Sequence, residues 1–481
     1  MNYINQKIKE VFPDLSVMKR ASNNALFKGR NLPSFVKDFV LRRYTDGEGN
    51  VNADALKQYL DEKMPIEAES VKQRLLNGGA VNITTRFVTI TDIANARVKV
   101  TLPELGINAD TYVTPQLLHD NPEGLADGEH WGNITLVYIE PEGKKKGYIQ
   151  LTTYLSFEPY KIDAKYFMQA RTQFSLDEWI DVLVTVMEYN AEMFSIEKKL
   201  EMISRMLPLV EPRLNMIELG PKGTGKSYVY SNLSKYAWLI GGGKTSRAKM
   251  FYNKTTKQFG VMKYYDVVGI DEISSFAFAD PDEMQSILKT YLEAGETKVD
   301  SVQFQSECGM VLMGNIPLTT DLKPQHTDYV RTLPAMFHDS ATMDRFHGFI
   351  EGWKMPRLNQ SHIMEGWTLN TEYFSTVLHL LRTASVYDTM FDTLVETEKD
   401  CDLRDKKAVR KLAAGYHKLL FPHIHHIEDV AEEDRENFKA LYAHYCLEPA
   451  VMRRQIIRRQ CHLIDKEFRA DMSEFSVKIN Q

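Results

Sequence analysis

At residues 220–227 the chain reads Gly220-Pro221-Lys222-Gly223-Thr224-Gly225-Lys226-Ser227, and this stretch decides how its central part folds. Every fixed position of the phosphate-binding loop pattern G-x-x-x-x-G-K-[ST] is present. Residues 214–219 are predicted to form a short buried strand before the loop, and residues from Tyr228 onward a helix after it. This order of strand, loop and helix favours a nucleotide site over the alternative, a glycine-rich turn that binds no nucleotide.

The residue types in the loop are those that triphosphate binding needs. Its glycines allow positive φ angles and let backbone amides approach phosphate closely, and the following helix N-terminus completes an anion cradle. Lys226 is predicted to reach the β- and γ-phosphates of ATP, and the hydroxyl of Ser227 to bind Mg²⁺. The sequence therefore predicts two cofactors, ATP and Mg²⁺, bound by loop 220–227.

A second apolar segment, residues 266–270, ends in two carboxylates, Asp271 and Glu272, as a Walker B strand does. It lies about 45 residues after Lys226. Asp271 is predicted to hold Mg²⁺, directly or through water, and Glu272 to orient or deprotonate the attacking water. The alternative is an exposed acidic helix start.

Three later polar residues complete the predicted catalytic set. Asn315 ends a further apolar strand. If this strand lies between the two Walker strands, Asn315 would contact the γ-phosphate or the attacking water, as the sensor 1 residue of AAA+ proteins does. The alternative is that Asn315 is a turn residue before a proline. Arg345 is predicted to reach the site of a neighbouring subunit, where its charge offsets that of the γ-phosphate; the alternative is a salt-bridged surface residue. Arg404 is predicted to be a lid residue that contacts phosphate in cis, and its rivals are Arg357, Arg410 and Lys411.

The ordered series of Walker A, Walker B, sensor 1, trans arginine and lid arginine predicts an α/β fold, an AAA+ P-loop NTPase core with a helical lid. Hydrophobic spacing predicts a helical region over residues 1–80 and a β-rich, small OB-like barrel over 81–162. The ATPase core is predicted over 163–365, and the lid with C-terminal helices over 366–481.

Basic residues on predicted loops are the candidate DNA contacts. Residues 244–257 interleave basic and aromatic side chains, and 253–257 is predicted to be a hairpin tip, with a second hairpin at 295–298. The candidates are Lys254, Lys257, Lys298, Lys144, Lys145 and Lys146. Arg453, Arg454, Arg458 and Arg459, at helical spacing, are predicted either to bind nucleic acid or an acidic partner or to be exposed helix charge. Solvated turns remain the alternative for the lysines.

The composition is that of a soluble globular protein, with 43% hydrophobic and 26% charged residues and a formal net charge of −6. Four widely spaced cysteines, no apolar run of about 18 residues and no signal-peptide core predict a cytoplasmic protein without a membrane partner. The negative net charge argues against a protein that coats nucleic acid with its whole surface, although a local basic channel is compatible with it.

Several longer segments resemble the BrxL family, the Lon-like AAA+ proteins of BREX phage-defence systems. They are residues 174–181, 217–227, 265–272, 337–345 and 419–423. The resemblance implies a DNA-associated N-terminal region, a core similar to that of ring helicases, and hexameric or double-hexameric rings on DNA. The expected partners are DNA, double-stranded in the first place with single-stranded DNA as the alternative, and other phage-defence proteins.

Many relatives continue into a Ser-Lys protease domain, whereas here about sixty residues follow His423 and are predicted to be helical. We therefore expect ATP hydrolysis without peptidase activity. The leading hypothesis is an ATP-driven ring motor on DNA in anti-phage defence. The alternatives are an ATPase that unfolds or remodels a partner protein, and a nucleotide-gated clamp that holds DNA as a scaffold.

Overall fold

The computed structural model separates the chain into two compact units. The described residues are 3–30, 32–65, 67–92, 95–107, 110–121, 125, 128–143, 146–156, 162–255 and 257–478. The larger unit comprises Met1–Lys19, Pro33–Phe35 and Ile162–Gln481, and the smaller unit comprises Arg20–Leu32 and Val36–Lys161. These limits differ from the predicted domains mainly at the N-terminus, where the first residues belong to the larger unit.

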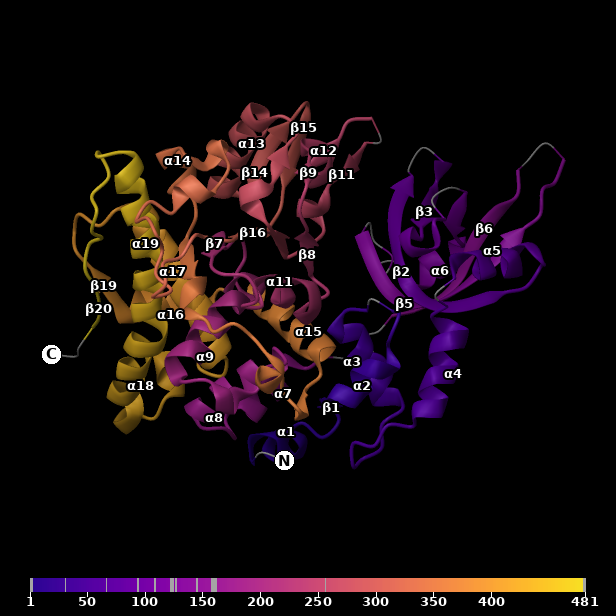
Figure 1. Ribbon diagram of the computed structural model, residues 1–481, viewed down its shortest axis with the longest axis horizontal. Helices are drawn as coiled ribbons and strands as arrows, with labels where there is room; N and C mark the ends of the chain where they lie inside the picture. The colour runs from indigo at the N-terminus through magenta and orange to yellow at the C-terminus, as the bar shows by residue number, and fades with distance from the viewer. Residues whose placement is uncertain are drawn as a thin grey trace. The chain divides into compact units, whose positions relative to one another are not determined.

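A five-stranded sheet in the order β17-β7-β16-β12-β8 forms the centre of the larger unit (Figure 1). All of its neighbouring strands are parallel. The strands are β7 (Met216–Leu219), β8 (Ala237–Ile240), β12 (Val267–Ile270), β16 (Gly309–Gly314) and β17 (Gly348–Glu351). The strand that ends at Asn315 thus lies between the two Walker strands, where the sequence predicted it.

Both faces of this sheet are covered, as is usual for parallel sheets. Successive residues of one strand enter different apolar clusters, since side chains alternate across a strand. Val267 belongs to a cluster with α8 (Leu176–Val186), α15 (Thr371–Arg382) and α17 (Leu403–Leu420), whereas Val268 belongs to a cluster with α13 (Pro281–Ala294). Every residue of β7, β12 and β16 is buried, so these short strands form a rigid platform for the loops at their carboxyl ends.

Helices surround the sheet on both sides. They are α7 (Ala164–Arg171), α8 (Leu176–Val186), α9 (Ile196–Ile203), α10 (Leu207–Val210), α11 (Lys226–Tyr228), α12 (Arg247–Met250), α13 (Pro281–Ala294), α14 (Ser340–Met343), α15 (Thr371–Arg382), α16 (Val386–Leu394), α17 (Leu403–Leu420), α18 (Arg435–Tyr442) and α19 (Glu448–Ile464). A capping box formed by Ser175 and Glu178 starts α8. The C-terminal part, residues 366–478, is mainly helical; it also contains β18 (Gly366–Leu369) and the short antiparallel pair β19 (Val395–Thr397) and β20 (Phe475–Val477).

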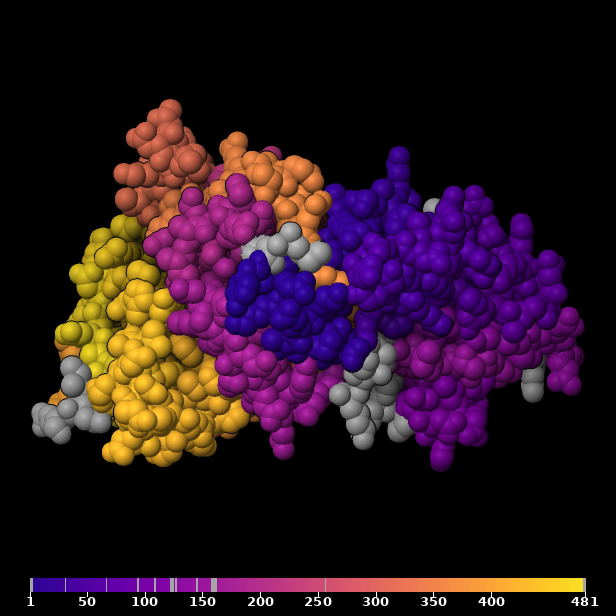
Figure 2. Space-filling view, turned by 90° about the horizontal axis from the view of Figure 1, so that it is seen from below, coloured from indigo at the N-terminus to yellow at the C-terminus, as the bar shows by residue number. Residues whose placement is uncertain are grey.

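The first residues of the chain pack into the larger unit rather than with the rest of region 1–80. Helix α1 (Tyr3–Val11) and the following Phe12 contribute apolar side chains to the same cluster as α7 and α8. Strand β1 (Ser16–Lys19) then pairs antiparallel with β18 (Gly366–Leu369). Figure 2 shows this dark-blue segment against the magenta surface of the larger unit. Burial of the apolar face of α1 explains why it is not part of the helical region predicted beside the barrel.

The smaller unit contains the predicted barrel. Its strands close in the order β2-β3-β4-β6-β5, with β4 and β6 parallel and the other pairs antiparallel. Five strands is also the strand number of the OB fold. The strands are β2 (Val81–Asp92), β3 (Arg97–Thr101), β4 (Thr111–Val113), β5 (Gly128–Ile139) and β6 (Tyr148–Ser156); the helices are α2 (Ala21–Leu26), α3 (Ser34–Arg43), α4 (Ala53–Lys63), α5 (Ala68–Leu76) and α6 (Pro115–Asp120).

Two hairpins project from the α/β unit. In the first hairpin, β10 (Tyr252–Asn253) and β11 (Gln258–Phe259) pair on either side of the predicted tip. Strand β9 (Lys244–Thr245), which lies before this hairpin in the chain, pairs with β13 (Ala277–Phe278). The second hairpin, predicted at 295–298, has its turn a few residues later in the chain. Residues 296–299 form strand β14, which pairs with β15 (Val302–Gln305), because Gly295 adopts φ 75° and ends α13. Among the described residues, no helix is both long and apolar enough to cross a membrane.

Candidate functional site

Loop 220–227 follows β7 and has glycine where no other residue fits. Gly223 and Gly225 adopt φ angles of 80° and 76°, which side chains disfavour. A Cβ atom added to Gly220 would lie 2.6 Å from the backbone carbon of Gly352. These glycines allow a tight turn after β7, of the kind that phosphate-binding loops form.

Lys226 brings the loop and the end of β16 together. Its ammonium group donates to the carbonyl oxygens of Gly220 at 3.2 Å and Pro221 at 2.8 Å, and to Asn315 Oδ1 at 3.4 Å. The side chain is 7% exposed, and burial lowers the pKa of Lys226. Two of the predicted residues, far apart in sequence, therefore meet at one point.

The two predicted magnesium ligands also meet. Ser227 Oγ donates to Asp271 Oδ2 at 2.5 Å, which joins the start of α11 to the end of β12. A hydroxyl and a carboxylate are oxygen ligands of the kind that Mg²⁺ takes, usually with waters and substrate phosphates completing its octahedron. The side chains present therefore fit Mg²⁺ at this position.

Glu272 lies beside Asp271 in an unusual backbone conformation. Its φ angle is 51°, in the left-handed region, and its amide donates to Asp271 Oδ1 at 2.8 Å. A side chain held in this region costs about 1–2 kcal/mol and persists only where the surroundings enforce it. The exposed carboxylate also lies next to the end of β8, since Oε2 is 3.1 Å from a Cβ atom built on Gly242.

A buried ion pair that the sequence patterns did not predict supports loop 220–227. Arg205 and Glu218 are both fully buried, with Nη2 and Oε1 2.6 Å apart. Arg205 Nη1 also donates to the carbonyl of Thr224 at 2.9 Å. A carboxylate in the middle of a buried apolar strand needs a charged partner, so Glu218 within β7 was the sequence feature that could have indicated this ion pair.

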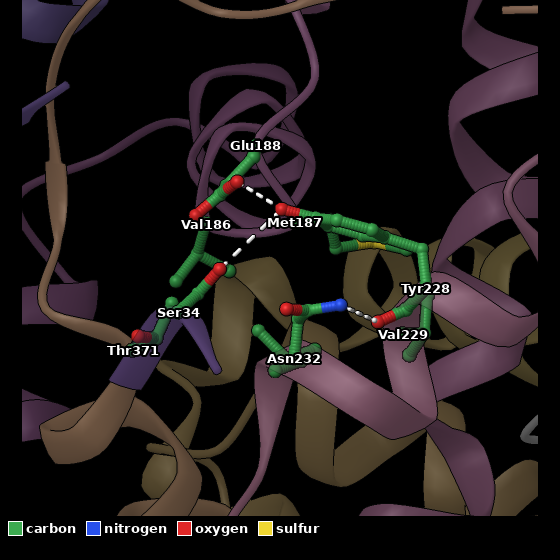
Figure 3. Close-up of a pocket in the computed structure, with 9 residues that line it drawn as sticks. Ser34, Val186, Met187, Glu188, Tyr228, Val229, Asn232 and Thr371 are labelled. Carbon is green, nitrogen blue, oxygen red and sulfur yellow. Dashed lines mark hydrogen bonds between the residues drawn. The ribbon is translucent and has the colours of Figure 1, made fainter. Parts of the chain in front are cut away.

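Tyr228, the residue after Ser227, is held by a second carboxylate, the half-buried Glu188. Its hydroxyl donates to Glu188, and Lys19 Nζ lies 2.8 Å from Glu188 Oε1. Figure 3 shows the hydroxyl directed at Glu188, with Ser34 on its other side at 3.4 Å. Burial opposes ionisation of Glu188, but the charge of Lys19 and bonds from Lys19 and Tyr228 hold its pKa at about 2. The helix after the loop is thus fixed, although beyond Tyr228 it continues as a π-helical turn rather than as a regular helix.

Arg345 lies at the end of the sheet opposite to the phosphate loop. It precedes β17, and Gly348, the first residue of β17, pairs in parallel with Met216, the first residue of β7. The loop follows the last residue of β7, so the strand length of roughly 13 Å separates the two ends. Arg345 Nε is 3.4 Å from Glu293 Oε2. This position favours the predicted contact with another copy's site.

Arg404 lies at the same end of the sheet as Arg345. Its Nη1 atom is 3.0 Å from Asp344 Oδ2, and its Nε atom is 3.2 Å from Glu293 Oε2. The cis assignment required a position at the carboxyl ends of the strands, where this structure does not place it. The reason is that α17, which begins at Leu403, packs its first turn near Asp344 rather than over the loop.

The rival lid residues have different surroundings. Arg410 pairs with Asp388 and Asp392 between α16 and α17. Lys411 is 3.6 Å from Glu211. Arg357 is exposed, and the next residue, Leu358, donates its amide to the carbonyl of Gly223 at 2.8 Å. Of these rivals, Arg357 is the one whose chain neighbour touches the loop.

The candidate DNA lysines that the structure describes are exposed, whereas Phe251, an aromatic residue of segment 244–257, is buried. Lys254, Lys257, Lys298 and Lys146 are exposed, whereas Lys144 and Lys145 lie outside the described residues. Phe251 is fully buried, with its ring centroid 5.2 Å from that of Phe304. It packs inside the protein and does not present a face to a base.

The basic stretch on α19 is not a nucleic-acid surface. Arg453, Arg454 and Arg458 are 5%, 0% and 7% exposed, and each is ion-paired with a carboxylate. Arg459 alone of the four is open to solvent, with a side chain 62% exposed. Helical spacing could not distinguish these cases, because the acidic partners come from distant segments.

Comparisons with known proteins cover most of the chain. Residues 149–474 match the family model "Lon-like protease BrxL-like, ATPase domain", and residues 10–138 match "BREX system Lon protease-like protein BrxL N-terminal". The chain is similar to the Lon-like protease BrxL of Escherichia coli O9:H4 (strain HS), with 31% identity over 84% of this chain and 59% of the relative. It is also similar to that of Bacillus cereus (strain H3081.97), with 28% identity over 90% of this chain and 64% of the relative. The chain thus spans about three-fifths of the length of these relatives.

Proposed function

This chain belongs to the BrxL family and carries its ATPase domain, and we propose that it is an AAA+ ATPase of BREX-type defence that forms a ring on DNA. Its proposed cofactors are ATP and Mg²⁺, and its proposed location is the cytoplasm. The chain covers only part of the length of its relatives, so activity on DNA is a proposal from this chain's own residues.

One observation carries the ATPase proposal: two separate pairs of predicted residues converge at the carboxyl ends of adjacent strands. Lys226 reaches Asn315, and Ser227 reaches Asp271. In the proposed mechanism, Lys226 and loop amides bind the phosphates, while Ser227 and Asp271 hold Mg²⁺, which would stabilise charge on the β- and γ-phosphates. Glu272 then orients the attacking water, and Asn315 hydrogen-bonds the γ-phosphate or that water.

The position of the two arginines supports the proposed assembly into a ring. Arg345 and Arg404 lie at the opposite end of the sheet from their own loop, so a contact with a γ-phosphate needs a second copy. In this structure the guanidinium groups of Arg345 and Arg404 are both paired with Glu293. We therefore propose that Arg404, like Arg345, contacts the γ-phosphate of a neighbouring subunit, instead of the predicted contact within its own subunit. The expected assembly is a hexamer or double hexamer.

DNA contact is proposed for the tips of the hairpins and for the barrel. Lys254, Lys257 and Lys298 are exposed on β-hairpins, where their charges can meet phosphates. In the barrel, the turn between β5 and β6 contains Lys146. This is the turn between the fourth and fifth strands, which in OB folds contacts oligonucleotides. The expected ligand is double-stranded DNA.

The test measures ATP hydrolysis by the full chain with duplex DNA, with a denatured protein, or with neither. A ring motor on DNA predicts stimulation by duplex DNA and DNA binding that falls steeply with salt. Stimulation by the denatured protein alone would replace this proposal with a protein-remodelling ATPase. Tight DNA binding with unchanged hydrolysis would replace it with a nucleotide-gated clamp.

A further inference from the structure

A single buried guanidinium group connects the surroundings of both interface arginines. Arg454 lies on α19 and is 0% exposed. Its Nη1 atom donates to the carbonyl oxygens of Asp344 at 2.9 Å and Phe346 at 2.7 Å. Its Nη2 atom donates to Asp344 Oδ1 at 2.5 Å, and its Nε atom to Asp405 Oδ1 at 2.7 Å. Arg454 therefore joins three chain segments through four hydrogen bonds.

These contacts fall on the neighbours of Arg345 and Arg404. Asp344 and Phe346 are the residues on either side of Arg345, and both of their carbonyl groups are tied to α19. Asp344 also accepts from Arg404 through its second oxygen, at 3.0 Å. One carboxylate thus receives the buried guanidinium on one side and the half-exposed one on the other.

The same segment is anchored to the strand that leads to the phosphate loop. His347 Nδ1 accepts from the amide of Asn215 at 3.0 Å, and the His347 amide donates back to the Asn215 carbonyl at 2.8 Å. Asn215 immediately precedes β7. Segment 344–347 is therefore fixed from two directions, by α19 and by the central sheet.

Net stabilisation does not account for a buried guanidinium with so many acceptors. Taking charges out of water costs several kcal/mol per ion, and a well-packed apolar set of similar volume is often as stable. What an apolar set cannot supply is a planar fork that fixes several acceptors in one geometry. The arrangement is therefore better explained by the position it imposes than by the stability it adds.

We propose that Arg454 is a positioning residue that holds Arg345 and Arg404 as a pair for the γ-phosphate bound by a second copy of this chain. The inference rests on the proposed ring, because each pair serves a neighbour's site. Arginine forks bind phosphate oxygens in defined directions. A displacement of about 1 Å in such a catalytic contact costs on the order of 10²-fold in rate.

The neighbouring residue Arg453 provides a matched control. It lies on the same helix and is 5% exposed, but its guanidinium bonds to the Tyr416 hydroxyl at 2.6 Å and to Glu201 at 3.1 Å. Both Arg454→Lys and Arg453→Lys keep the positive charge but lose the planar, forked guanidinium group. We expect Arg454→Lys to lower kcat on the order of 10²-fold with unchanged ADP affinity, and Arg453→Lys to leave kcat near that of the wild type.

Mixing subunits separates positioning in trans from a fault in the variant's own site. Arg454→Lys subunits have an intact loop, and Lys226→Ala subunits have intact interface arginines. In mixed assemblies, an Arg454→Lys site next to a Lys226→Ala subunit regains its arginine pair, so hydrolysis rises above that of either protein alone. Assembly size by light scattering and cooperative thermal unfolding verify that each variant folds and assembles.

The same mixing experiment with Arg345→Ala distinguishes the two ways to fail. Recovery with Arg345→Ala but none with Arg454→Lys would overturn the role of Arg454 and leave the proposed ring intact. No recovery with either would overturn the trans arrangement itself. If Arg454→Lys does not fold, Asp405→Ala takes its place, because it removes the carboxylate that accepts from Arg454 Nε. A kcat equal to that of the wild type would then contradict the inference.

Discussion

Ser227 Oγ lies 2.5 Å from Asp271 Oδ2, and this hydrogen bond joins the phosphate loop to the end of the next-but-one strand. The two residues are 44 positions apart in sequence. They meet because β7 and β12 run parallel on either side of β16, so their carboxyl ends share one edge of the sheet. The adjacent Glu272 is then the carboxylate best placed to act on water.

Substitution Glu272→Gln is expected to abolish turnover while ATP binding is retained, because the amide cannot accept a proton and the Mg²⁺ ligands are untouched. Steady-state phosphate release and binding of a fluorescent ATP analogue measure the two properties. Glu283→Gln, at an exposed site on α13, serves as the control. Full turnover in the Glu272→Gln variant would remove Glu272 from the mechanism.

Arg404→Ala is expected to lose most ATP hydrolysis, and mixing with Lys226→Ala subunits is expected to restore part of it. The reason is that Arg404 lies with Asp344 at the sheet end opposite to its own loop. Arg410→Ala removes an arginine from the same helix that pairs with Asp388 and Asp392 instead, and should retain activity. Loss that no mixing ratio repairs would support the contact in cis.

Glu218→Gln is expected to destabilise the protein by about 3–5 kcal/mol, since it leaves the fully buried Arg205 without a counter-charge. The free energy of unfolding from urea titrations measures the loss. The apolar pair Arg205→Met with Glu218→Leu should be more stable than the single variant, because no uncompensated charge remains. It should still bind ATP more weakly, as Thr224 loses its support. A single variant as stable as wild type would contradict the predicted loss.

Stability should fall in acid through Glu188. Burial raises its pKa, but Lys19 and Tyr228 outweigh this and hold the pKa at about 2, below its usual 4.5. The carboxylate therefore contributes stability above pH 4.5, and this is lost as pH falls toward 2, by up to about 3 kcal/mol. Urea titrations of wild type and Glu188→Gln should converge over this range. Parallel curves, as expected for the exposed control Glu10→Gln, would show that Glu188 titrates normally.

Replacing Lys254 and Lys257 together by Ala should weaken duplex binding and reduce its salt dependence by roughly two units of slope if both contact phosphates. Fluorescence anisotropy over a range of salt concentrations measures this slope. Lys72→Ala, which removes a lysine paired with Glu69, should leave it unchanged. An unaltered slope in the double variant would assign these lysines to solvated loops.

Local patterns were sufficient to predict the strands that precede Gly220, Asp271 and Asn315, the barrel, and the meeting of Lys226 with Asn315. Each depends on short-range composition and on the rule that parallel strands share their carboxyl ends. The support for the loop could not be predicted in the same way. Arg205 and Glu218 lie on different elements, and a charged residue in an apolar strand indicates a partner without identifying it. The surroundings of Arg404 could not be predicted for the same reason, because Asp344, which accepts from it, is 60 positions away.

The central claim is that loop 220–227 binds the triphosphate of ATP. Equilibrium titration of a non-hydrolysable ATP analogue with Mg²⁺ tests it most directly, on wild type, Lys226→Ala and the control Lys222→Ala. Wild type and the control should bind, since Lys222 is a variable position of the motif, and Lys226→Ala should lose most of its affinity while remaining folded. Equal affinity in wild type and Lys226→Ala, or no binding to folded wild type, would contradict the account.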